Sequence, residues 1–557
     1  MPSWAMILLP QAILIVAACI IAAGMRLMDL DRTWKAIGML AVIGAAFALL
    51  GVAEESSLPA SNPALSAPQL SSESQPDPAT HAPVLQDSLS ISLQWICLAV
   101  GTILVLSGLQ SPPHAIDTDW LPRALLSMAG AMLTCVAADL LLLFVVLELT
   151  VLPWAVQQEQ VETSSGNAAP DRLYLNLTAS LFLLLGFAAL YGLTGSSHVD
   201  AVRAALESGS LPNSTRPAGV SEMGVVAMVF IVAGLAVRLG VAPFHFGLPE
   251  VFENASTPAA LLVWPRIAAF VVLLRVPCEA MASLGATGQW LVWVLSMSSM
   301  IVGGARAVAE TNIRRRLAYA TLAQGGIVLA GITVGYWELA HGSYGIDLGR
   351  DLPGGMKSGL ACFVCHLFAI AGLVAVLSYL QKPGRSVDHL DDLKGVFRSE
   401  PLAGLCALVL LLSLAGAPPL PGFWSNLLVL GGTLSVPAEF AGELLPAPAP
   451  GFALLGIVVG VTMLLISMAY VGMVASLFLE GQIARPGRAG GRAALVAALL
   501  AALFIAGAGL LPGPLLRQLE EIELSEAEGG TNAGAGKMET TGLEPATSAV
   551  QGRRSPN

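Results

Sequence analysis

The stretch of sequence most informative about the fold is Gly234-Leu-Ala-Val-Arg238-Leu-Gly-Val-Ala-Pro243-Phe-His245-Phe-Gly-Leu-Pro-Glu-Val-Phe-Glu-Asn-Ala-Ser-Thr-Pro258. An apolar run that carries Arg266 follows it. Irregular backbone at membrane depth is tolerated only where protein or a water-filled cavity covers it. Charged side chains at that depth commonly mark ion paths. The stretch therefore predicts a broken membrane helix at a functional site.

The composition places the chain in a membrane. Of its 557 residues, 55% are hydrophobic and 12% are charged, whereas soluble domains have about 25% charged residues. Apolar runs near the ~20 residues that cross a bilayer predict about fourteen spans. They lie near 4–24, 34–52, 90–110, 121–138, 139–157, 172–194, 222–246, 257–277, 286–308, 314–335, 357–381, 399–434, 451–479 and 493–512. The run 399–434 is too long for one straight span, so we expect it to be broken. The net charge of −11 lies largely in loops, and we expect no nucleic-acid partner.

Basic residues alternate between the connections, which predicts the orientation of the spans. Arg26, Arg32 and Lys35 follow the first span, and further clusters lie at 306–316, 382–398 and 485–492. The connections 51–94 and 434–451 contain no Lys or Arg. Because basic loops stay in the cytoplasm, we expect both termini on the extracytoplasmic side.

Prolines interrupt two of the predicted spans. Pro243 breaks the seventh, and Pro418, Pro419 and Pro421 break the twelfth. Two such spans in corresponding halves indicate a transporter built from inverted repeats. The alternative is that the prolines only kink packed helices, which membrane helices tolerate.

Polar residues at membrane depth extend the pattern. Glu148 lies in an almost unbroken apolar run, so its carboxylate must be protonated or paired. Arg238 is the expected partner, and Arg266, Gln324 and His366 follow on later spans. These groups could relay protons, or Glu148 and Arg238 could form a static ion pair that fixes helix packing.

The cysteines do not predict a metal site. Most of the seven lie in apolar runs, where small buried side chains are expected. Cys362-x-x-Cys365 followed by His366 lacks the remaining ligands of a four-ligand site.

Several motifs together resemble a known family. Leu147-Glu148-Leu149 resembles the glutamate motif of the antiporter-like subunits of respiratory complex I. Gly234–Pro258 resembles the signature around a lysine and Pro-Phe-His in subunit N of NADH-quinone oxidoreductase. Glu310–Gln324 and Ser413–Phe423 resemble two further motifs of that subunit. The resemblance covers roughly residues 90–480 and fits subunit N better than its homologues L and M.

The resemblance implies an all-α membrane fold of about fourteen helices, with two inverted repeats of about five helices and breaks in helices seven and twelve. It implies N-terminal spans in 1–110 with a Pro/Ser-rich extracytoplasmic loop at 53–89. It further implies an antiporter-like core at 111–480, followed by a last span in 481–512. The tail 513–557 is expected to be disordered.

The resemblance also implies a function. The chain would be a membrane-arm subunit that couples NADH oxidation and quinone reduction, both elsewhere in the complex, to proton translocation across a bacterial inner membrane. It would bind no cofactor itself, contain no catalytic residue, and contact the other membrane-arm subunits. The alternatives are a cation/proton antiporter subunit of the same superfamily and a structural scaffold of the arm.

The departures from the family fall on the implied proton pathway, which comprises Glu148, Arg238, His245, Arg266, Gln324, His366 and Asn426. The family has lysines at the positions of Arg238, Arg266 and Asn426, and a histidine at that of Gln324. Arginine is effectively always charged and asparagine does not titrate. Two hypotheses remain: water-mediated conduction around fixed charges, or a structural subunit with little or no conduction.

Overall fold

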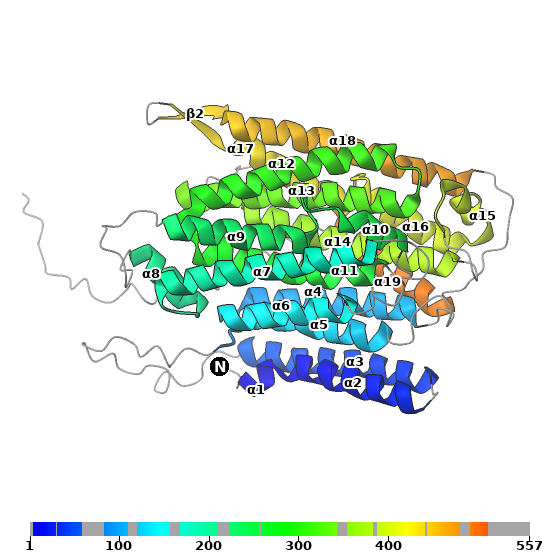
Figure 1. Cartoon of the computed structure of the whole chain (residues 1–557). Coiled ribbons are helices and arrows are strands. Elements are labelled where there is room, and N and C mark those ends of the chain that lie inside the picture. Colours follow the sequence, from blue (N-terminus) through cyan, green and yellow to red (C-terminus); the bar gives the residue numbers. More distant parts are fainter. Residues whose placement is uncertain are drawn as a thin grey trace, which may run out of the picture.

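The computed structural model describes residues 4–28, 31–57, 83–109, 120–155, 168–208, 222–254, 258–341, 354–381, 387–440, 443–479 and 491–510. Within them, long helices lie side by side in one bundle, all roughly along the same axis (Figure 1). This arrangement follows from the sequence, because a segment in lipid satisfies its backbone polar groups only by forming a helix or a closed barrel.

The first half of the chain forms long apolar helices with several shorter ones between them. They are α1 (Trp4–Ile7), α2 (Leu9–Leu27), α3 (Asp31–Ser57), α4 (Ser88–Gly108), α5 (Trp120–Val136), α6 (Leu140–Ala155), α7 (Ala168–Thr194), α8 (Val199–Ser208), α9 (Glu222–Leu239), α10 (Gly247–Asn254) and α11 (Pro258–Leu273). A π-helical turn, η3 (Leu274–Ala280), continues α11, and η4 (Ala282–Leu284) follows it.

The second half continues the bundle. Its elements are α12 (Gly285–Ala309), α13 (Ile313–His341), α14 (Gly355–Leu380), η5 (Leu390–Leu393), α15 (Val396–Ser399), α16 (Pro401–Leu414), α17 (Pro421–Ser435), α18 (Pro450–Phe478) and α19 (Gly491–Leu510). A short antiparallel hairpin, β1 (Pro437–Phe440) with β2 (Glu443–Pro448), connects α17 to α18. This hairpin has no counterpart among the elements predicted from the sequence.

Ten of the described helices are long and apolar enough to cross a membrane. Three shorter apolar helices lie at Trp120–Val136, Leu140–Pro153 and Pro401–Leu414. The multi-pass helical fold is therefore confirmed, whereas the number of fourteen spans stays a prediction.

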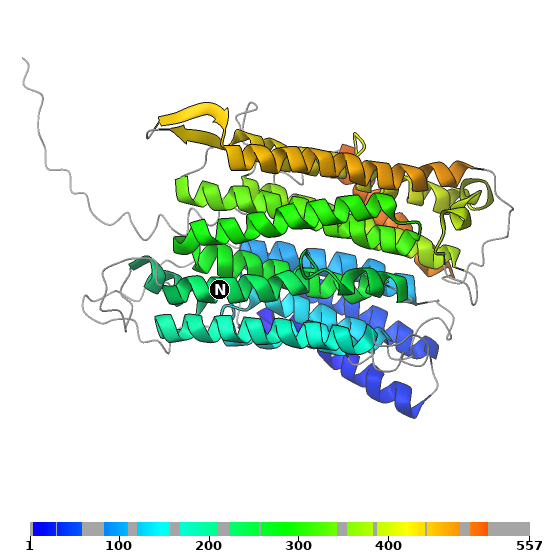
Figure 2. The same cartoon turned by 45° about the horizontal axis from the view of Figure 1, so that its top comes forward.

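The centre of the bundle is formed by α13 and α14. The most apolar window is 94% buried in α13 and 100% buried in α14, compared with 33% in α2 and in the segment 174–194 of α7. The cartoons show the outer helices surrounding this pair (Figures 1 and 2). Helices that are apolar all round are typical of such a central position.

Both predicted breaks are present and have the same backbone geometry. In the first, Gly240 N–H donates to the Val237 carbonyl (3.1 Å) and Val241 N–H to the Ala236 carbonyl (3.1 Å). In the second, Gly416 N–H donates to Ser413 (3.0 Å) and Ala417 N–H to Leu412 (2.9 Å). Both glycines have positive φ, 66° and 71°, which favours glycine at a helix C-terminus.

Each of these glycines precedes a cis proline, Pro243 in the first break and Pro419 in the second. The two broken helices run in opposite directions, α9 toward α10 and α16 toward α17 (Figure 1). Equivalent breaks in oppositely directed helices are what inverted repeats produce.

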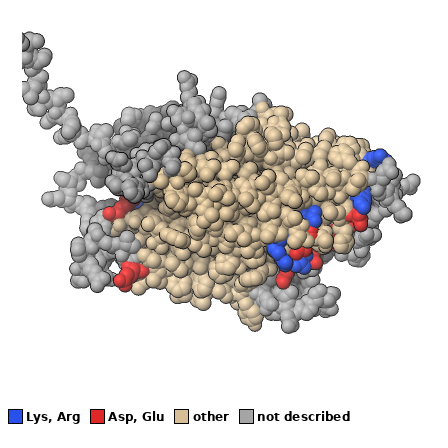
Figure 3. All heavy atoms as spheres, turned by 90° about the horizontal axis from the view of Figure 1, so that it is seen from above, with Lys and Arg blue, Asp and Glu red and all other residues tan. Residues whose placement is uncertain are grey.

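Charged residues gather at the ends of the bundle. On the face in Figure 3, Lys and Arg lie at one end, and a broad belt between the ends carries no visible charge. The basic run Arg314, Arg315 and Arg316 at the start of α13 pairs with Asp388 (3.0 Å), Glu253 (3.4 Å) and the Glu310 carbonyl (3.0 Å). This asymmetry agrees with the predicted alternation of basic loops, although the side of the termini stays a prediction.

Two regions of the sequence analysis lie outside the described residues: most of the loop 53–89 and the tail 513–557. The proposed division into 1–110, 111–480 and 481–512 likewise stays a prediction.

Candidate functional site

A buried ion pair joins α6 to α9. Arg238 Nη2 donates to Glu148 Oε1 and also to Ser180 Oγ on α7, at 2.7 Å. The Arg238 side chain is 1% exposed and that of Glu148 is 20% exposed. Arg238 Nε and Nη1 are buried and have no partner in the described part of the chain. The predicted pairing of Glu148 with Arg238 is therefore present, and Ser180 is a contact that the sequence analysis missed.

The broken backbone after α9 is held by polar side chains from two other helices. Arg266 Nε on α11 donates to the carbonyl oxygen of Leu239 at 2.7 Å. On α12, Ser299 Oγ accepts from the Ala242 N–H (3.0 Å) and Ser298 Oγ donates to the Ala242 carbonyl (2.9 Å). These contacts satisfy groups that a helix end leaves free.

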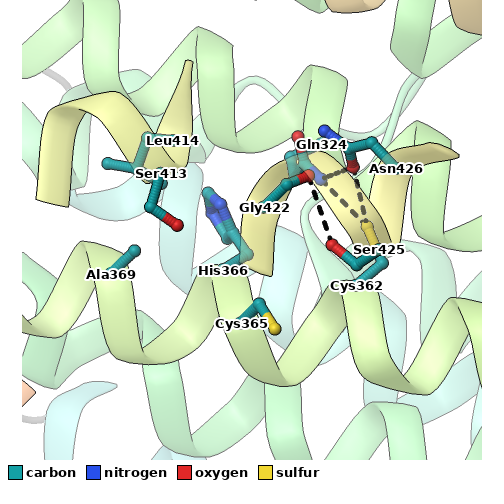
Figure 4. Close-up of a pocket in the computed structure, with 10 residues that line it drawn as sticks. All are labelled: Gln324, Cys362, Cys365, His366, Ala369, Ser413, Leu414, Gly422, Ser425 and Asn426. Carbon is teal, nitrogen blue, oxygen red and sulfur yellow. Dashed lines mark hydrogen bonds between the residues drawn. The ribbon is translucent and has the colours of Figure 1, made fainter. Parts of the chain in front are cut away.

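A cluster of amide and thiol groups lies where α13, α14 and α17 meet. Gln324 Nε2 donates to Asn426 Oδ1 (2.7 Å) and to Cys362 Sγ (2.9 Å), and Cys362 Sγ lies 3.2 Å from Asn426 Oδ1 (Figure 4). All three residues are buried. Cys362, which the sequence analysis interpreted as a small buried hydrophobe, therefore takes part in hydrogen bonding.

Two small cavities meet at His366 and Gln324. One, shown in Figure 4, is lined by these two residues together with Asn426, Ser413 and Cys365. The other is lined by them together with Arg266 and Thr321. His366 Nε2 is buried and has no partner among the described residues. His366 and Gln324 thus line both the cavity that contains Arg266 and the cavity that contains Asn426.

His245 lies apart from this row. Its ring is half-buried between α9 and α10, stacks on Phe246 at 4.8 Å between ring centroids, and has Nδ1 3.3 Å from the Pro243 carbonyl. It lines neither cavity. Among the described residues, no hydrogen bond or ion pair joins it to Glu148 or Arg238, and its place on a proton pathway stays a prediction.

The other predicted residues form a row through the interior. The row begins at the Glu148–Arg238 pair and continues to Arg266, which donates to the carbonyl of Leu239, next to Arg238. From Arg266 it continues through the two adjoining cavities to Asn426. Thr321 was also missed by the sequence analysis. It lies on the same face of α13 as Gln324, three residues earlier, and this spacing could have found it.

The chemistry open to this row is limited by its side chains. The resemblance implies lysines at 238, 266 and 426, where this chain has two arginines and an asparagine. A guanidinium does not release its proton in proteins, and an amide does not titrate. Glu148 and His366 are the titratable members, apart from the buried thiols. Within the described residues, no group of three or more His, Cys, Asp or Glu side chains is placed to hold a metal ion.

A bundle of membrane-length helices with two broken helices and buried charges at its centre defines a transporter-like membrane protein. A family model described as "NADH:quinone oxidoreductase/Mrp antiporter, TM" matches residues 137–441, which is more than half of the chain. The chain belongs to this family, and the resemblance inferred from its motifs is confirmed.

Curated relatives carry the name NADH-quinone oxidoreductase subunit N. The protein of Herminiimonas arsenicoxydans is 34% identical over 270 residues, 48% of this chain and 51% of that relative. The protein of Polaromonas naphthalenivorans is 31% identical over 354 residues, 61% of this chain and 67% of that relative. The chain thus matches between about half and two thirds of the length of these relatives.

Solved structures share the fold. A chain of respiratory complex I from Thermus thermophilus aligns with a TM-score of 0.67 at 24% identity, covering 92% of this chain and 99% of that one. A chain of the Mrp complex from Dietzia sp. aligns with a TM-score of 0.68 at 19% identity, covering 93% and 96%. At these identities the likeness concerns the fold alone.

Proposed function

We propose that this chain is a membrane-arm subunit of an NADH-quinone oxidoreductase in a bacterial inner membrane. Its curated relatives bear the name of subunit N of that enzyme, and its fold is shared with a chain of respiratory complex I. NADH and quinone would react elsewhere in the complex, and the other membrane-arm subunits would be its partners.

We further propose that the chain itself conducts protons poorly or not at all. The main support for this proposal is the cluster of Gln324, Asn426 and Cys362, where two amides and a thiol are hydrogen-bonded to one another. The family places a histidine and a lysine at residues 324 and 426, whereas neither amide can take up or release a proton. The Glu148–Arg238 pair then serves to join α6 to α9, as buried ion pairs do elsewhere.

Proton pumping driven by NADH in inverted membrane vesicles tests both parts. Glu148→Gln is compared with wild type after native electrophoresis has shown that the complex assembles. The matched control is Glu253→Gln, which removes a carboxylate that faces Arg315 at 3.4 Å near the surface. We expect the number of protons moved per NADH to be unchanged in both variants.

A large fall in that ratio for Glu148→Gln alone would overturn the non-conducting role. If Glu148→Gln does not assemble, the double variant Gln324→Leu with Asn426→Leu replaces it, because it removes both polar partners together. Absence of the chain from an NADH-oxidising complex would overturn the membership.

A further inference from the structure

The cavity between α11, α13 and α14 has an unusual polar lining. Four polar side chains from these helices line it, those of Arg266, Thr321, Gln324 and His366. Its other lining residues are apolar or glycine. No carboxylate is among them. The cavity therefore offers one permanent positive charge and several hydrogen-bonding groups in an apolar surround.

Two of these polar groups have no hydrogen-bond partner within the described part of the chain. Thr321 is 1% exposed, and its Oγ1 is buried without a hydrogen-bond partner in the described residues. His366 is 8% exposed, and its Nε2 is likewise buried without a hydrogen-bond partner in the described residues. Buried polar groups are nearly always satisfied, so two orphans in one cavity indicate a ligand that accepts their hydrogen bonds.

The charge of Arg266 has no counter-charge beside it in the part of the chain that the structure describes. Among the described residues, no carboxylate lies within 4.0 Å of the Arg266 guanidinium, whereas Arg238 pairs with Glu148. Its recorded hydrogen bond is from Nε to the Leu239 carbonyl. Nη2 lies 3.5 Å from the Cβ position of Gly325, another lining residue, so the guanidinium reaches the cavity wall. A buried charge without a partner is expensive, and a counter-ion removes that cost.

We propose that this cavity binds a small monovalent anion of the halide class, such as chloride. The Arg266 guanidinium supplies the opposite charge, and the Thr321 hydroxyl and the His366 Nε2–H donate hydrogen bonds. The cavity has room for about one or two water-sized particles, which suits a chloride ion and excludes a carboxylate metabolite. A cation is excluded by Arg266.

The anion would have a definite consequence for the row of polar residues. It would neutralise Arg266 between the Glu148–Arg238 pair and the Asn426 cluster, where the family has a lysine that can become neutral by losing its proton. A fixed arginine with a bound anion reaches the same local neutrality without a proton. This binding does not depend on the enzyme complex proposed above.

Equilibrium dialysis of radioactive chloride against the purified full chain in chloride-free gluconate buffer tests the proposal. The variant Thr321→Val removes one donor with little change in shape. Its matched control is Thr333→Val, also on α13 and fully buried, whose hydroxyl donates within the helix to Leu329 at 2.9 Å. We expect saturable binding near one ion per chain, with affinity reduced about tenfold in Thr321→Val and unchanged in Thr333→Val.

The location is tested by soaking crystals in bromide and recording anomalous scattering, with a peak expected beside Arg266. The proposal would be overturned by any of three results: absence of saturable binding in wild type, equal affinity in the two threonine variants, or a cavity that holds only water. Arg266→Gln should abolish binding. If that variant does not fold, the threonine pair still decides the result.

Discussion

Gly422 packs so closely against Ser413 that a Cβ atom at residue 422 would overlap the Ser413 carbonyl oxygen. Ser413 lies near the end of α16, and Gly422 lies in the first turn of α17. The break in the twelfth predicted span therefore brings two backbone segments into direct contact. Only glycine permits such an approach without displacement of the chain.

Gly422→Ala should consequently destabilise the fold by about 1–3 kcal/mol, because the added methyl group overpacks the contact. Gly460→Ala on α18 is the control, since no atom lies within 4 Å of its Cβ position. That variant should be neutral or more stable by about 0.5–1 kcal/mol. Thermal unfolding of the purified chain in detergent measures both, and equal midpoints would contradict the expected contact.

Loss of one member of the central ion pair should cost more than loss of both. Glu148→Leu leaves the Arg238 charge buried and unpaired, which we expect to cost about 3–5 kcal/mol. Adding Arg238→Met removes that charge and should recover much of the stability. Unfolding midpoints of the two single variants and the double variant complete the cycle. A double variant that is less stable than Glu148→Leu would show that the pair matters for another reason.

Ser180 should support the ion pair through its hydrogen bond to Arg238 Nη2. Ser180→Ala removes a bond to a charged group, so we expect a loss of about 1.5–3 kcal/mol. Ser476→Ala is the comparison, because this buried hydroxyl donates within its own helix, to the Gly472 carbonyl at 2.9 Å. Similar midpoints for the two alanine variants would argue against a role for Ser180.

The cluster around Asn426 should behave as a coupled unit. Asn426→Leu removes the Oδ1 acceptor that Gln324 Nε2 and Cys362 Sγ share, at a cost of about 1–3 kcal/mol. Adding Gln324→Leu should recover part of this loss, because both members of the bond are then apolar. Thermal unfolding of the single and double variants measures the coupling. Strictly additive losses would mean that the hydrogen bond contributes nothing.

Most residues of the candidate site could be predicted from the sequence. The apolar run around Glu148 required a partner, and Arg238 is that partner. Gln324 came from its polar side chain at membrane depth and Asn426 from a family motif, and the two are hydrogen-bonded to each other. His245 came from the same motifs but lies apart from the row. Ser180 was missed because a single hydroxyl in an apolar helix has no signal of its own, whereas the position of Thr321 three residues before Gln324 could have revealed it.

The sequence by itself determined the membrane helices and the places where two of them break. Both depend on local properties: runs of apolar residues long enough to cross a bilayer, and glycine and proline at fixed positions that end a helix. The tertiary structure decided which side chains meet. The bond from Arg266 to Leu239 and the convergence of Thr321 and His366 on one cavity depend on how each helix is rotated and shifted against its neighbours. Those rotations are set by packing between residues far apart in the chain, which no local pattern encodes.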